Sequence, residues 1–82
     1  MLSAVIAVLI SRRTEDAPKF QEVLTRHGCI IKTRLGLHEV DGCREDGLVI
    51  LHVCGSEQAL GDLVSDINAL SNIRAQIMKL DF

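Results

Sequence analysis

The chain of 82 residues contains no tryptophan or tyrosine and only two phenylalanines, Phe20 and Phe82. Because hydrophobic residues still make up 48% of the sequence, its core must be built mainly from Val, Ile, Leu and Ala. We expect one domain over residues 1–82, since the chain is too short for two. A domain of this size buries only roughly 60% of the surface that its unfolded chain exposes. The excess of aliphatic residues therefore indicates that another subunit covers part of the apolar surface.

The sequence also lacks clustered positive charge. Its formal net charge is −2, and its 9 Lys and Arg residues are scattered along the chain without neighbouring aromatic residues. Nucleic-acid binding requires Lys and Arg groups that contact phosphates together. We therefore expect no direct binding to nucleic acid.

No apolar run is long enough to cross a membrane. The run from Leu2 to Ile10 has about half of the roughly 20 residues that a spanning helix requires, and it has neither the basic start nor the cleavage site of a secretory signal. The three cysteines, Cys29, Cys43 and Cys54, form no CxxC pair and cannot all pair within one chain. We therefore expect reduced thiols in a cytoplasmic protein without membrane association.

Catalytic signatures are missing as well. The sequence identifies no nucleophile with a neighbouring base, and it forces no pair of carboxylates together. The acidic stretch from His38 to Gly47 lacks the ligand order of an EF-hand and is interpreted as a solvated hairpin loop. We expect neither an enzyme nor a bound cofactor.

The hydrophobic pattern predicts the element order βαββαβ. Continuous runs of β-branched residues are typical of buried strands, and alternating apolar and polar residues are typical of half-buried strands. Apolar residues at helical spacing are typical of helices. Helices are predicted between Thr14 and Gly28 and between Ser56 and Asn72. Strands are predicted at Ala4 to Ser11, Cys29 to Leu37, Leu48 to Cys54 and Ile73 to Leu80.

This order indicates an α+β fold of the ferredoxin-like type. Right-handed crossovers place both helices on one face of an antiparallel sheet, and the two continuously apolar strands belong at its centre, which gives the strand order 4-1-3-2. The other face is then uncovered and largely apolar, and we expect Lys32, Arg34, Arg74 and Gln76 to form its polar rim. An apolar centre with a polar rim is typical of a protein interface. We therefore predict a homo-oligomer, a dimer or tetramer, that associates through sheet faces.

A ligand site is predicted on the second strand. Gly36 weakens a strand and indicates either a bulge before the hairpin or the close approach of a backbone or ligand. Arg34 lies two positions away on the same face, where its guanidinium suits a carboxylate or phosphate. We take Arg34, Gly36 and Lys32 as candidate ligand-binding residues for a small-molecule effector.

A metal site is the alternative. His38 and Cys43 lie at the hairpin, and His52 and Cys54 share one face of the third strand. Imidazole and thiolate groups suit nickel, zinc or copper. The alternative interpretation is that these residues bind no metal. Cys54 is then a small apolar side chain of a strand, and His52 is a single polar side chain at an interface.

Three segments define a family resemblance: TRLGL (Thr33 to Leu37), GLVILHVCGSEQALGDLVSDINAL (Gly47 to Leu70) and IRAQIMKL (Ile73 to Leu80). Through them, and over essentially the whole chain, the sequence resembles the family of iron-only hydrogenase system regulators. That family is similar to ACT-type regulatory domains and to the C-terminal domain of the nickel-responsive repressor. The resemblance implies a ferredoxin-like subunit of a dimer or tetramer with a regulatory, ligand-sensing role.

The resemblance to the repressor does not include the repressor's metal site or its DNA-binding segment. Where the repressor holds nickel with an HxH pair, this chain offers only His38 and Cys43, and the DNA-binding ribbon has no counterpart. The leading hypothesis is therefore a regulatory module that binds a small ligand near subunit interfaces. The alternative is a metal sensor that uses His38 and Cys43, with His52.

Overall fold

The computed structural model describes residues 1–11, 13–37 and 47–81. The predicted order of strands and helices is confirmed, and a short 3-10 helix, η1, precedes the second strand. The elements in chain order are β1 (Leu2–Ile10), α1 (Arg13–Arg26), η1 (Gly28–Ile30), β2 (Ile31–Leu37), β3 (Gly47–Gly55), α2 (Glu57–Asn68) and β4 (Ile73–Leu80).

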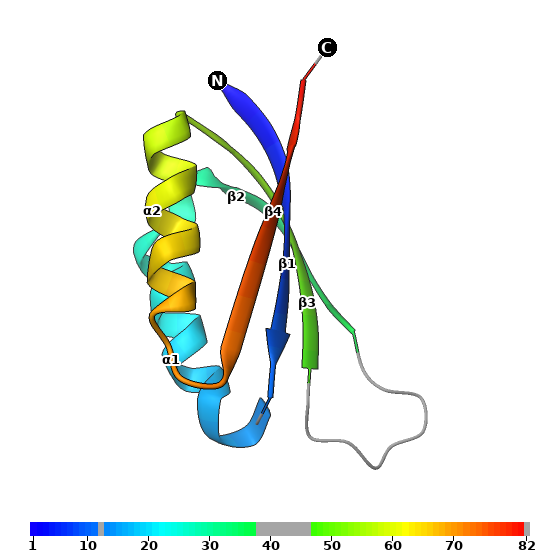
Figure 1. Cartoon of the computed structure of the whole chain (residues 1–82), viewed down its shortest axis with the longest axis vertical. Helices are drawn as coiled ribbons and strands as arrows, with labels where there is room; N and C mark the ends of the chain where they lie inside the picture. The colour runs from blue at the N-terminus through cyan, green and yellow to red at the C-terminus, as the bar shows by residue number, and fades with distance from the viewer. Residues whose placement is uncertain (12, 38–46, 82) are drawn as a thin grey trace.

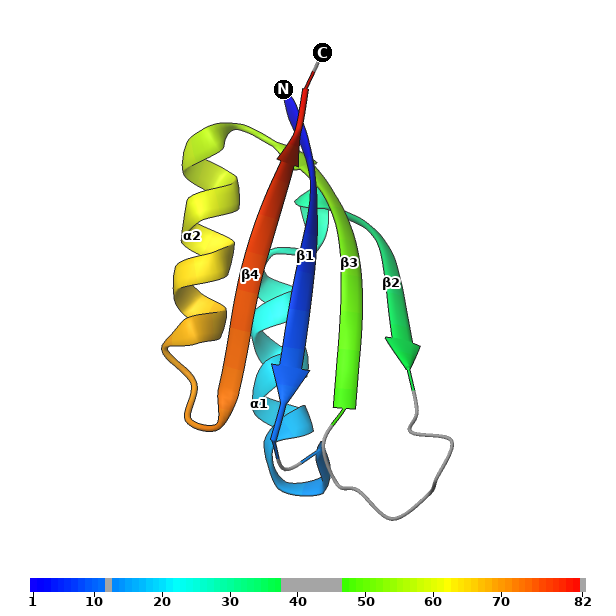
Figure 2. The same cartoon turned by 45° about the vertical axis from the view of Figure 1, so that its right-hand side comes forward.

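The four strands form one antiparallel sheet in the order β2-β3-β1-β4, which is the predicted order read from the opposite edge. Both helices lie on the same side of this sheet (Figure 1). Turning the molecule shows the strands side by side, with β1 and β3 at the centre and β4 and β2 at the edges (Figure 2). The predicted ferredoxin-like fold is confirmed.

The core lies between the sheet and the helices. Alternate residues of β1, from Ala4 to Ile10, are buried against the helices, and Phe20 of α1 has no exposed surface. Each large aliphatic side chain buried there contributes about 1.5–3 kcal/mol of transfer free energy. The buried residues are Ala4, Ile6, Val8, Ile10, Phe20, Val23, Leu24, Val49, Leu51, Val53, Leu60, Leu63, Ile67, Ile73 and Ala75.

Polar side chains fix both ends of α2. The Ser56 hydroxyl accepts a hydrogen bond of 3.1 Å from the backbone N–H of Ala59, as expected for an N-cap. The Asn68 amide bonds both the N–H and the C=O of Ala75 on β4. Asn72 then adopts a left-handed φ of 66°, which asparagine tolerates better than most residues, and the chain enters β4.

The predicted alternation of β2 is wrong in one respect. A register irregularity lies between Ile31 and Thr33, so that Ile31 pairs with a core residue while Thr33 pairs with His52 on the uncovered face. An extra residue in a strand reverses the faces of everything that follows it. Arg34 therefore points toward the helices, and it does not belong to the rim of the uncovered face as expected.

The uncovered face, which we call the open face, is largely apolar. Its members are set by the strand register: Ser3, Val5, Ala7 and Leu9 of β1, Thr33, Leu35 and Leu37 of β2, Leu48, Ile50, His52 and Cys54 of β3, and Arg74, Gln76, Met78 and Leu80 of β4. Leu9, Leu35 and Met78 are 50%, 52% and 65% exposed. Arg74 and Gln76 lie at its edge, as predicted.

Candidate functional site

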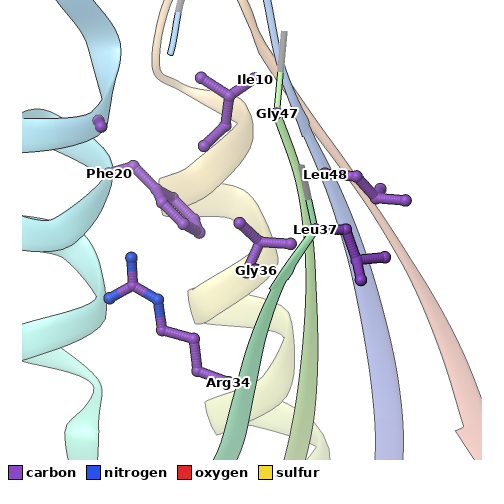
Figure 3. A pocket seen from close by; sticks show the side chains of 9 residues that line it. Ile10, Phe20, Arg34, Gly36, Leu37, Gly47 and Leu48 are labelled. Carbon is purple, nitrogen blue, oxygen red and sulfur yellow. The ribbon is translucent and has the colours of Figure 1, made fainter. Parts of the chain in front are cut away.

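A cavity of about 190 Å³ lies between α1 and the ends of β2 and β3. Phe20 and Arg34 project into this space from opposite sides, whereas the side chains of Leu37 and Leu48 point away across the sheet (Figure 3). Nine residues line the cavity: Ile10, Ala17, Phe20, Arg34, Gly36, Leu37, Gly47, Leu48 and Val49. The cavity is thus an opening into the edge of the hydrophobic core, on the helix side of the sheet.

The Arg34 side chain is held from two directions. Its guanidinium carbon lies 5.8 Å from the centroid of the Phe20 ring, within the range of a cation–π contact. One guanidinium nitrogen donates a hydrogen bond to the side-chain oxygen of Gln21, on the same helix as Phe20. Arg34 is the only charged side chain among the described residues that line the cavity. The site therefore joins apolar walls to one positive group.

Gly36 leaves space beside Arg34. The register of β2 with β3 is continuous from Thr33 to Leu37, so the bulge that we considered at Gly36 does not occur there. A Cβ atom added at Gly36 would meet nothing within 4 Å, and its φ lies outside the left-handed region. Neither backbone conformation nor close packing requires glycine here. The absence of a side chain at Gly36 leaves an unfilled volume at the cavity wall.

The structure brings together two of the three predicted ligand residues. Arg34 and Gly36 pair with the buried residues Leu51 and Val49, so they share the helix-facing side and line one cavity. Lys32 is exposed at the register irregularity and does not line the cavity.

Sequence reasoning missed two groups of lining residues. Phe20 lies within the predicted first helix, where an apolar side chain gives no sign of a ligand site, and the ends of the apolar strands, Ile10 and Gly47, carry no polar signal. The one feature of the sequence that distinguishes Phe20 is that it is one of only two aromatic residues, the other being Phe82 at the end of the chain.

Of the metal candidates, the structure brings together only His52 and Cys54 among the described residues. His38 and Cys43 lie outside the described residues. On the open face, Nε2 of His52 lies 3.1 Å from Oγ of Ser3 and 4.0 Å from Sγ of Cys54. Within residues 1–11, 13–37 and 47–81, no group of three or more His, Cys, Asp or Glu side chains is arranged to hold a metal ion.

Comparison with known proteins finds solved structures of similar fold but no family of similar sequence. No family model and no curated protein sequence matches the chain. The uncharacterized protein TM1266 of Thermotoga maritima superposes with a TM-score of 0.86 at 15% identity, over 96% of each chain.

Other neighbours include structures of CPII, a nitrogen regulatory PII-like protein of Thiomonas intermedia. In the complex with ADP, AMP and bicarbonate, the TM-score is 0.62 at 11% identity, over 100% of this chain and 93% of CPII. In the complex with ADP, AMP and acetate, it is 0.51 at 13% identity, over 99% and 89%. These likenesses show the fold. Separately, none of the helices in the described residues has the length and apolar character to span a membrane.

Proposed function

We propose that this chain is a small-ligand-sensing regulatory module that works as a homo-oligomer. The observation that supports it best is the cavity beside Phe20, where Gly36 leaves space and Arg34 supplies a positive group. Concave sites with apolar walls and a few oriented polar groups are typical of small-molecule binding. We expect the chain to respond to ligand without catalysing a reaction.

The structural neighbours are consistent with this role. CPII is a nitrogen regulatory PII-like protein whose structures contain ADP, AMP and bicarbonate or acetate, so a similar fold supports regulatory ligand binding elsewhere. Fold alone does not determine function, and the argument for this chain rests on its own cavity. From the family resemblance of its sequence, we further propose that the system it regulates is an iron-only hydrogenase.

The open face supports the oligomer. Four strands about 4.8 Å apart and about eight residues long, at about 3.4 Å per residue, cover roughly 500 Å². Two such faces bury roughly 1,000 Å², the lower limit for a specific interface. The surface is corrugated: two shallow hollows share Ala7 and Gln76, and Leu9 and Leu48 stand beside one of them. A second copy of this chain suits both the size and the apolar character of the face.

One experiment tests both parts of the proposal. Thermal-shift screening of the full chain with organic acids, nucleotides and divalent metals, combined with light scattering, measures ligand response and assembly together. We expect a mass of at least two chains and an increase in Tm with one ligand class, because a ligand that binds only the folded state stabilises it. A monomer that responds to none of the three classes would refute the proposal.

A metal sensor is the second candidate. The observation that favours it is the proximity of His52 Nε2 to Cys54 Sγ, since tetrahedral zinc bonded to one nitrogen and one sulfur separates these atoms by roughly 3.6 Å. Two copies facing each other would supply a second such pair, and the predicted His38 and Cys43 remain further candidates. Metal analysis of untagged protein tests it. A metal content well below one per dimer would exclude it.

A further inference from the structure

The cavity beside Phe20 also indicates which kind of ligand it takes. Resting on the ligand-sensing function proposed above, we propose that this site binds a small carboxylate with a compact, branched apolar body. The size of the cavity, the nature of its walls and Arg34, the one charged side chain among its described lining residues, each limit the ligand independently.

Size excludes most effectors. The cavity measures about 190 Å³. Sites for drug-sized molecules measure about 300–1,000 Å³. Within the described residues this space is smaller than a whole nucleotide needs, whereas a branched carboxylic acid of about six to eight non-hydrogen atoms fits it.

The walls require an apolar body. Ile10, Phe20 and Val49 are 3%, 0% and 7% exposed, so the cavity ends on side chains that belong to the core. Ala17 completes this surface from α1. Among the described lining residues, Arg34 is the one charged partner for an ion such as phosphate, whose remaining oxygens would lose water against these apolar groups without replacement hydrogen bonds. A branched hydrocarbon gains free energy from the same contact.

Arg34 supplies the carboxylate partner. A guanidinium carries five N–H donors in a rigid fork, and the bond to Gln21 uses a nitrogen at one end of it. Contact with the Phe20 ring limits the rotation of the fork, which reduces the entropy lost on binding. An ammonium group on the ligand would approach this positive charge and be repelled by it. The site therefore favours a simple acid over the corresponding α-amino acid.

The test uses four probes on the full chain, measured by isothermal titration calorimetry. Isocaproate carries both the branched body and the carboxylate, isohexanol keeps the body without the charge, acetate keeps the charge without the body, and leucine adds an ammonium group. We expect isocaproate to bind at least about tenfold more tightly than isohexanol or acetate, because a charge-assisted hydrogen bond and buried apolar area each contribute that much. Leucine should also bind more weakly than isocaproate, because its ammonium group is repelled by Arg34.

Two variants and two matched controls locate the site. Arg34→Gln removes the charge, and we expect isocaproate affinity to fall at least about tenfold. Gly36→Val fills the space beside it and should abolish binding; Gly36→Ala serves if the valine variant does not fold. Arg26→Gln removes an exposed arginine at the end of α1, outside both the cavity and the open face, and Gly61→Ala adds a Cβ that also meets nothing within 4 Å. Both controls should bind isocaproate like the wild type.

The outcomes separate this inference from the function on which it rests. Equal affinity for isohexanol, acetate or leucine, or unchanged binding by Arg34→Gln, would overturn the ligand class. If nucleotides or metals raise Tm and isocaproate does not, the chain remains a ligand sensor and only the carboxylate assignment fails. If no probe of any class binds and the chain is monomeric, both proposals fail.

Discussion

At the scale of single residues, Asn68 connects α2 to the sheet. Its side-chain amide donates to the C=O of Ala75 at 3.1 Å and its oxygen accepts from the N–H of Ala75 at 2.8 Å. Because β4 is an edge strand, the outward backbone groups of Ala75 have no neighbouring strand, and Asn68 takes the place of one. The same contact covers part of an edge that would otherwise be open to pairing with another chain.

We predict that Asn68→Ala lowers the free energy of unfolding by about 1–2 kcal/mol, because two hydrogen bonds are lost and partly replaced by water. Urea denaturation measures the change. Ser65→Ala, at an exposed position of the same helix, is the control, since serine and asparagine have similar helix propensities relative to alanine. Equal stabilities of the two variants would contradict a role for the Asn68 contact.

At the scale of elements, an exposed ion pair joins the start of α2 to the end of β4. Lys79 Nζ lies 2.9 Å from Glu57 Oε1, and this hydrogen bond, together with the positive charge of Lys79, lowers the pKa of the Glu57 carboxyl below its ordinary value of 4.5. A lowered folded-state pKa means that the pair contributes stability above the unfolded pKa. That contribution is lost as pH falls through the folded pKa.

We therefore predict that Glu57→Gln weakens the dependence of stability on acid. Between pH ~6 and pH ~3 the wild type should lose slightly more unfolding free energy than the variant, as measured by urea titration at each pH. The effect is small because exposed pairs are screened by water. In a Lys79→Gln background, the same Glu57 substitution should change the pH dependence much less. An equal change in both backgrounds would show that Lys79 is not the cause.

At the scale of the whole molecule, the open face is the surface through which we propose that two copies of the chain associate. Leu9 lies on a central strand, 50% exposed, between Leu48 of β3 and Arg74 of β4. If two open faces pack together, this position becomes buried, whereas the fold of each chain does not depend on it. A charge placed there would be desolvated without a partner, at a cost of several kcal/mol.

We predict that Leu9→Lys reduces the mass measured by light scattering to that of one 9.0 kDa chain while the circular dichroism spectrum is kept. Gln58→Lys, on the exposed surface of α2, adds the same charge away from the sheet and should leave the assembly intact. Retention of the wild-type mass by Leu9→Lys would mean that assembly uses another surface.

The patterns of the sequence predicted the elements well where burial is unambiguous. The fourth strand has the predicted bounds, and Ser56 caps the second helix as expected from its side-chain chemistry. The second strand was harder, because η1 replaces its first residues and the irregularity before Thr33 reverses its faces. One extra residue in a strand leaves no trace in an alternating pattern of this length, so Arg34 was assigned to the wrong side of the sheet.

The amino-acid sequence by itself determined the fold, because right-handed crossovers place both helices on one face of the sheet and the two continuously apolar strands belong at its centre. It also determined that one sheet face is apolar, since side chains alternate along every strand. Tertiary structure alone decided that Arg34, Gly36 and Phe20 share a cavity. These residues meet through strand register and helix packing, which depend on contacts between segments far apart in the chain.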